Sequence, residues 1–99
     1  MDNDGFTALA YAVKEDDLES SKRLIAMGGD PNAIIGRQKI PLLAIAVISR
    51  SKESVKYLIA NGADANAKVR EDVSILDLAV GLGYSEIVEV LNNTSGKHV

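Results

Sequence analysis

The sequence predicts an all-α protein built from three stacked helix-turn-helix repeats, which form a solenoid with a finger-like loop between successive repeats. Two similar ten-residue segments begin at Leu24 and Leu58 and lie 34 residues apart. The same offset aligns the segments that begin at Thr7 and Pro41, and a further step of 33 residues reaches Ser74. Self-similarity at a fixed period is the signature of a repeat architecture. We expect one domain over residues 1–99, with repeats at about 4–36, 37–70 and 71–93 and a flexible tail at 94–99.

The first helix of each repeat is predicted from its cap and its apolar spacing. Thr7 and Ser74 stand where an N-cap oxygen accepts free backbone N–H groups, and Pro41 at the same place suits a first helical turn. Apolar residues then recur at helical spacing in every copy. The small residue at one of these positions is alanine in each copy, which favours close approach of neighbouring helices: Ala12, Ala46 and Ala79.

The second helix of each repeat is predicted to begin near an acidic residue, Glu19, Glu53 or Glu86. Acidic side chains suit the positive end of a helix. Gly28 and Gly62 stand where a glycine in the left-handed region ends such a helix. The segments after these glycines are polar and predict the turn-bearing connections between repeats.

These motifs together resemble the ankyrin repeat, over nearly the whole chain from about Asp4 to Leu91. The family pattern is Thr-Pro-Leu-His-x-Ala-Ala, a second helix and then Gly-Ala-Asp-x-Asn-Ala, at a period of about 33 residues. The resemblance is strongest in three segments: Asp4-Gly5-Phe6-Thr7, Gly62-Ala63-Asp64-Ala65-Asn66-Ala67 and Gly83-Tyr84-Ser85-Glu86-Ile87-Val88.

The chain departs from the family pattern at three places. The histidine position holds Ala10, Ala44 and Asp77, which removes a local hydrogen-bond network and predicts a softer stack. Asp16 and Arg50 replace the usual glycine of the inter-helix turn. One extra residue between Asn32 and Pro41 predicts a distorted finger loop there.

The two ends of the stack should present polar faces, because each repeat contacts only its neighbours. Ser21 and Arg23 stand where the middle repeat has Val55 and Tyr57, which indicates an N-terminal cap, and a polar segment follows Leu91. We therefore expect a complete three-repeat domain that is a monomer. The alternative is end-to-end dimerisation through exposed apolar residues of the final helix, for which the candidates are Ile87 and Val90.

Composition limits the possible partners and the compartment. The chain lacks cysteine, which fits a reducing compartment, and we expect a cytoplasmic location. Its N-terminus is acidic where a signal peptide is basic, and its longest apolar stretch is too short to span a bilayer. The net charge of −3, with basic residues concentrated in the middle third, does not favour nucleic acid. We expect neither a nucleic-acid nor a membrane partner.

Catalysis is not indicated by the residues present. His98 is the only histidine and lies at the very end of the chain, so no general base is at hand for a Ser-His-Asp arrangement. The acidic run Glu15-Asp16-Asp17 falls in an inter-helix turn, where charges are usually solvated. Gly81-Leu82-Gly83 lacks the rest of a dinucleotide fingerprint. We expect no enzyme activity, no metal and no cofactor.

The resemblance implies that another protein binds at the finger tips and on the concave side formed by the first helices. On this chain the fingers are residues 2–6, 34–40 and 68–73. Each ends on an apolar residue, Phe6, Ile40 or Val73, which either forms an apolar row at the base of the groove or packs against the helices and the next finger. The other candidate contacts are the finger residues and side chains of the first helices: Ile34, Ile35, Arg37, Lys39, Arg70, Glu71, Asp72, Tyr11, Lys14, Ile48 and Asp77.

The predicted function is therefore non-catalytic binding of another protein, acting by occlusion or scaffolding. A small chain of this type resembles inhibitor or immunity-type proteins that mask one partner. The alternative is a structural unit that associates with itself through the repeat ends. The sequence does not identify the partner, because a fold does not fix a function.

Overall fold

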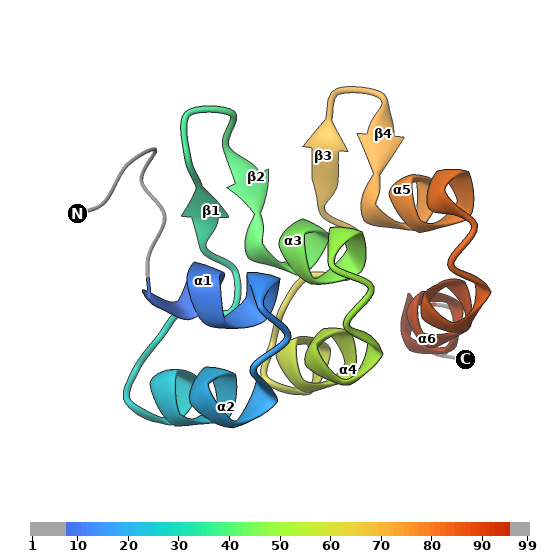
Figure 1. Ribbon diagram of the computed structural model, residues 1–99. Coiled ribbons are helices and arrows are strands. Elements are labelled where there is room, and N and C mark those ends of the chain that lie inside the picture. The colour runs from blue at the N-terminus through green and yellow to red at the C-terminus, as the bar shows by residue number, and fades with distance from the viewer. Residues whose placement is uncertain (1–7, 96–99) are drawn as a thin grey trace.

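Three pairs of antiparallel helices stack side by side, and a β-hairpin connects each pair to the next (Figure 1). The computed structural model describes residues 8–95. The elements, in chain order, are α1 (Ala8–Lys14), α2 (Leu18–Ala26), β1 (Ile34–Ile35), β2 (Ile40–Pro41), α3 (Leu42–Ile48), α4 (Lys52–Ala60), β3 (Lys68–Arg70), β4 (Val73–Ser74), α5 (Ile75–Leu82) and α6 (Ser85–Ser95).

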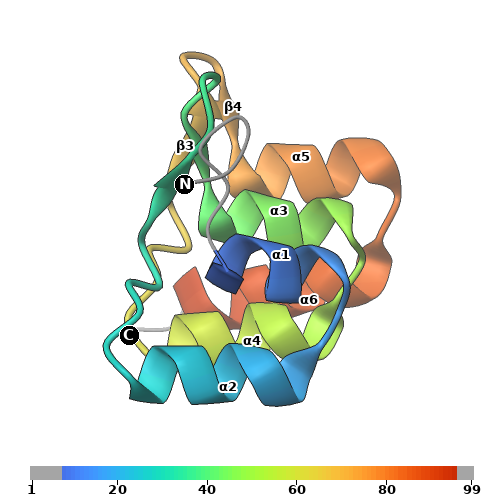
Figure 2. The same ribbon diagram turned by 60° about the vertical axis from the view of Figure 1, so that its left-hand side comes forward.

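The helices form two layers, with α1, α3 and α5 in one row and α2, α4 and α6 in the other (Figure 2). The predicted three-repeat, helical architecture is confirmed. Helix α3 lies at the centre of the stack, and every residue from Leu42 to Val47 is buried. The aligned alanines Ala12, Ala46 and Ala79 are all buried, as predicted for positions where helices approach closely.

The predicted helix ends are confirmed where the structure describes them. Ser74 caps α5 through a capping box: its Oγ accepts from the Asp77 backbone N–H at 3.1 Å, and the Asp77 carboxylate accepts from the Ser74 N–H at 3.2 Å. Gly28 and Gly62 follow α2 and α4 with φ of 105° and 103°. No residue with a side chain adopts such angles without strain. Thr7, the predicted cap of the first helix, lies outside the described residues.

The inter-helix turn needs the left-handed conformation in all three repeats. Gly83 has a φ of 77° in the third repeat, and Asp16 and Arg50 hold the same place with φ of 60° and 56°. The departures from glycine that the sequence shows are therefore positions of backbone strain.

We expect Asp16→Gly to stabilise the protein by about 0.5–1 kcal/mol, the relief of left-handed strain less the added flexibility of the unfolded chain. The reciprocal change Gly83→Asp should destabilise it by a similar amount. Urea unfolding followed by circular dichroism measures both. Equal midpoints for the two variants and the parent would show that this turn stores no strain.

Ser21 does not form a polar outer cap, and this part of the sequence prediction is wrong. The side chain is 1% exposed, and its Oγ donates to the Asp17 carbonyl oxygen at 2.9 Å. The helix that packs against α2 also presents buried serines, Ser51 and Ser54. Their hydroxyl groups have no hydrogen-bond partner in the described part of the chain. The contact between α2 and α4 is thus more polar than that between α4 and α6, where Val55 and Ile87 are buried.

The first hairpin is regular, contrary to the predicted distortion. Ile34 pairs with Pro41 and Ile35 with Ile40, so the extra residue is absorbed in the turn, where Gly36 and Lys39 have positive φ. The irregularity lies instead in the second hairpin, whose register shifts between Lys68 and Arg70.

The side chain of Asn32 connects the first two repeats. Its Nδ2 donates to the Gly62 carbonyl oxygen at 2.9 Å, and its Oδ1 accepts from the Asp64 N–H at 2.8 Å. Within each loop, Asp30 and Asp64 accept from the N–H two residues later. The Asp-x-Asn motif therefore holds each turn and also fixes the spacing between repeats.

The last helix is longer than predicted. Helix α6 reaches Ser95, although the flexible tail was expected to begin at residue 94. Residues 96–99 lie outside the described part. Within residues 8–95, every helix is too short or too polar to cross a membrane.

Asp17 is the N-cap of α2 and introduces a pH dependence. Its carboxylate accepts from the Ser20 N–H at 3.1 Å. Hydrogen bonds from the Ser20 side chain and then from its backbone, with a smaller contribution from the charge of Arg23, lower the pKa of Asp17 below its ordinary value of 3.8. A lowered folded-state pKa adds stability that is complete above the ordinary value and is lost as the pH falls through the folded-state pKa.

Asp17→Asn should therefore leave stability near pH 7 almost unchanged, because asparagine is an equally good N-cap. Below pH 3.8 the variant should lose less stability than the parent on further acidification. Urea midpoints across this pH range test the expectation. An identical acid response in both proteins would assign the pH dependence to other carboxylates.

Candidate functional site: the fingers and the first-helix face

Two surfaces meet at the candidate site. The hairpins β1–β2 and β3–β4 stand side by side at one end of the first helices, and the row of α1, α3 and α5 continues from their base (Figure 2). A shallow depression lies between the two fingers and is lined by Gln38, Ile40, Val69 and Arg70. Both surfaces belong to elements of regular secondary structure that contribute residues to the hydrophobic core.

The adjacent isoleucines of β1 have opposite roles. Ile34 is 58% exposed, whereas Ile35 is 2% exposed and belongs to the hydrophobic core. Side chains alternate between the two faces of a strand, so only one of the pair can point outward. The prediction that Ile35 contacts a partner is therefore wrong, and Ile34 remains a candidate.

The predicted apolar row is half buried. Ile40 packs against the core and lines the depression between the fingers beside Val69. Val73 is also half buried and pairs with Arg70 across the second hairpin. The third member, Phe6, lies outside the described residues. Ile40 is therefore partly packed against the core, and part of its surface faces the depression between the fingers.

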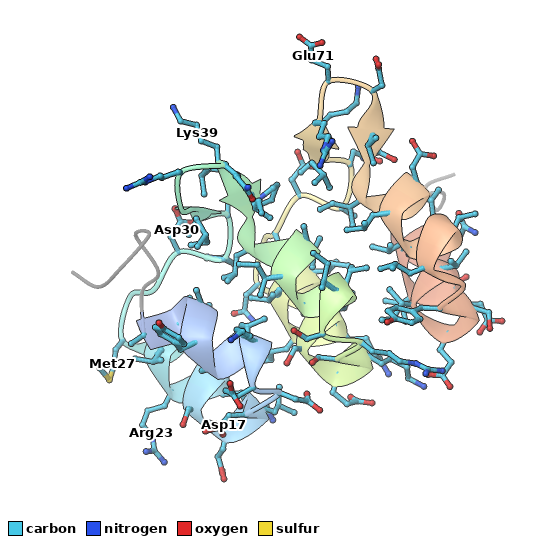
Figure 3. The ribbon with its side chains drawn as sticks, turned by 45° about the horizontal axis from the view of Figure 1, so that its top comes forward. Asp17, Arg23, Met27, Asp30, Lys39 and Glu71 are labelled. Atoms are coloured by element: carbon cyan, nitrogen blue, oxygen red, sulfur yellow. The ribbon has the colours of Figure 1, made fainter. Side chains whose placement is uncertain are left out.

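Charged side chains are exposed on both fingers. Lys39 and Glu71 point outward from the tips of the two fingers (Figure 3). Arg37, Arg70 and Asp72 are also exposed. The first finger is purely basic at its tip and the second carries both signs. A charged rim around an apolar centre is the usual arrangement of a protein interface.

The first-helix face adds apolar surface beside the fingers. Tyr11 and Lys14 lie on the same side of α1, with the ammonium nitrogen 5.9 Å from the ring centroid. Ile48 occupies the place of Lys14 in the next repeat and is an exposed hydrophobic residue, as is Tyr11. The structure therefore brings Tyr11, Lys14 and Ile48 into one row.

Asp77 lies elsewhere. Its equivalents Ala10 and Ala44 are fully buried, so this position faces the elements that follow each repeat rather than the groove. Its carboxylate belongs to the capping box of α5. The expectation that Asp77 projects into the groove is corrected accordingly.

The residues suspected of end-to-end association are not exposed. Ile87 is fully buried in the core, and Val90 is half buried and lines a groove between α4 and α6. Sequence reasoning missed other exposed apolar residues: Val80, Leu82 and Met27. The alignment of the repeats could have indicated that Val80 is exposed. Its equivalents Val13 and Val47 lie in repeats that are followed by another repeat, whereas Val80 lies in the third of the three repeats.

The acidic run in the first inter-helix turn serves the backbone: Asp16 holds the left-handed turn and Asp17 caps α2. Over residues 8–95, no group of three or more histidine, cysteine or acidic side chains is placed to hold a metal ion.

Pairs of antiparallel helices in two layers, with hairpin fingers between successive pairs, define a helical-repeat solenoid. The family model of three ankyrin repeats matches residues 9–99. The chain belongs to the ankyrin-repeat family, whose members are generally protein–protein interaction modules.

The fold is similar to that of the ankyrin repeat domain of human ASB11, with a TM-score of 0.81 and 26% sequence identity. The similarity covers 93% of this chain and 41% of that domain, so this chain spans less than half of the length of that domain. No curated protein sequence matches the chain.

Proposed function

We propose that this protein binds another protein through one continuous surface, made of the finger tips and the exposed face of the first helices. The observation that carries the proposal is the exposure of Ile34 on a hairpin that Ile35 fixes to the core. An apolar side chain held outward on a rigid element loses little conformational entropy when it is buried by a partner. Tyr11 and Ile48 extend the apolar surface along the helices.

We propose further that binding acts by masking the partner, as in a small inhibitor or immunity-type protein. Masking requires only a rigid surface that is complementary to the partner. The apolar centre, with Arg37, Lys39, Glu71 and Asp72 around it, supports this mode of action. The charged rim would set the orientation and the rate of encounter, while the buried centre would set the lifetime of the complex.

The triple variant Tyr11→Ser, Ile34→Ser, Ile48→Ser should stay folded, because all three side chains are exposed. Its affinity for the partner should fall by about a hundredfold or more, as expected when several central contacts are lost. Met27→Ser is the matched control, since Met27 is 72% exposed and is the C-cap of α2, in the layer of second helices and not on the first-helix face.

The partner is first obtained by affinity capture from the host's own extract and identified by mass spectrometry, and each variant is then titrated against the purified partner by calorimetry. Inhibition of the partner's activity at stoichiometric binding would support masking. Undiminished binding by a folded triple variant would contradict the proposed surface.

A further inference from the structure

The third repeat exposes a face that is covered in the other two. This face, called the open end, is formed by Asp77 and Val80 of α5 and by Val88 of α6, and the exposed Glu89 of α6 stands at its edge, beside the groove toward α4. Helices α5 and α6 lie at the end of the stack, and no other described element lies beyond them (Figure 1). The open end is separate from the fingers and from the first-helix row that carry the proposed function.

Equivalent residues show what such a face normally contacts. Val13 and Val47 are fully buried, whereas Val80 at the same position of the third repeat is 58% exposed. On the second helices, Ser21 and Val55 are buried, whereas the equivalent Val88 is only half buried. Within the molecule, the helices of the next repeat cover this face twice. The shape of the open end therefore suits a helical occupant.

The open end carries an acidic residue where the equivalent positions of the first two repeats carry lysine. Glu89 holds the position that Lys22 and Lys56 hold in the first two repeats. Inside the stack, Lys52 and Lys56 of α4 line the same groove as Glu86 and Glu89 of α6, so basic and acidic side chains face each other there. Residues 73–95 contain three acidic residues and no lysine or arginine. A complementary occupant is therefore basic.

A second copy of this chain does not meet that requirement. Residues 1–33 carry seven acidic and three basic residues, so head-to-tail stacking would bring two acidic ends together. Tail-to-tail pairing would bring the acidic face against itself. Like charges across an interface disfavour association.

We propose that the open end is a second docking surface, and that its occupant is a basic amphipathic helix of a partner protein. The helix would cover Val80 and Val88 with its apolar side and place lysine or arginine residues opposite Asp77 and Glu89. This mode of recognition uses an amphipathic helix laid on an apolar face. It does not depend on the proposed function of the fingers, and either can fail without the other.

Two synthetic helical peptides test the proposal, one of leucine and lysine and one of leucine and glutamate, each about 14 residues or four turns long. Fluorescence anisotropy should show binding of the lysine peptide and not of the glutamate peptide. Amide NMR signals of α5 and α6 should shift, and those of the fingers should not. Val80→Lys should weaken binding by about tenfold or more, whereas Met27→Lys, an equal change of charge at another exposed apolar residue, should not.

Several results would overturn the proposal. One is equal binding of both peptides, and another is equal loss of binding in Val80→Lys and Met27→Lys, which would indicate attraction by net charge alone. A dimer in light scattering that Val80→Lys dissociates would make a second copy the occupant. Amide NMR signals of α5 and α6 can also be recorded without peptide before and after deletion of residues 96–99. A shift of these signals on deletion would make the chain's own tail the occupant.

Discussion

Replacing Val47 with lysine is expected to remove most of the stability of this protein, whereas the same replacement at Val80 is expected to leave it folded. The two valines hold the same position in successive repeats. Val47 is completely buried at the centre of the stack, and Val80 is exposed at its end. The comparison therefore separates the effect of burial from that of residue type and helix position.

The physical reason is the cost of placing an ammonium group where no partner or water can stabilise it. A buried, unpaired charge destabilises a protein by about 4 kcal/mol or more. A domain of this size has a total stability of about 5–15 kcal/mol. At Val80 the ammonium group stays in water, and the expected change is within about 0.5 kcal/mol.

Circular dichroism and urea unfolding measure both variants. Equal destabilisation at the two positions would mean that the end of the stack is as well covered as its centre. That result would contradict both the three-repeat arrangement and the open end.

The second large effect is expected at the adjacent isoleucines of the first finger. Ile35→Ala should destabilise the protein by about 2–4 kcal/mol, because it leaves a cavity in the core. Ile34→Ala should change the stability by about 0.5 kcal/mol or less, because that side chain is in solvent.

Binding should show the opposite pattern. Ile34→Ala should weaken capture of the partner, and Ile35→Ala should affect it only as far as it unfolds the finger. Unfolding midpoints together with titrations of the folded variants distinguish the two roles. Equal stability of the two variants would mean that the hairpin register, with Ile35 paired to Ile40, is incorrect.

Much of the fold could be predicted because the repeat supplies three independent copies of each local signal. The glycines after the second helices, the cap at Ser74 and the buried alanines all follow from alignment of the copies, and the structure confirms each of them. The left-handed turns at Asp16 and Arg50 could also have been inferred, since both align with Gly83.

The roles that could not be predicted depend on which neighbour covers a residue. Ile34 and Ile35 are chemically identical, and a strand of two residues is too short to show which of them faces the core. Ser21 is polar but buried, because its position faces the next repeat whatever its chemistry. Ile87 is predicted from the sequence to be exposed, but its equivalent in the second repeat, Ser54, is buried, and so is Ile87.

The candidate site was predictable as a region but not residue by residue. The fingers and the first-helix row follow from the family resemblance, and Tyr11, Lys14 and Ile34 lie on this surface. Ile35 and Asp77 do not, because Ile35 belongs to the hydrophobic core and Asp77 stands at a helix position whose equivalents Ala10 and Ala44 are buried.

Site-specific photo-crosslinking tests the central claim most directly. A photoreactive phenylalanine analogue is placed at Ile34 or Ile48 on the proposed surface, or at Lys22 on the opposite layer of second helices, and each protein is irradiated in the host extract. We expect one common crosslinked partner from Ile34 and Ile48 and none from Lys22. A partner that crosslinks to Lys22 and not to Ile34 or Ile48 would contradict binding through the fingers and the first-helix face.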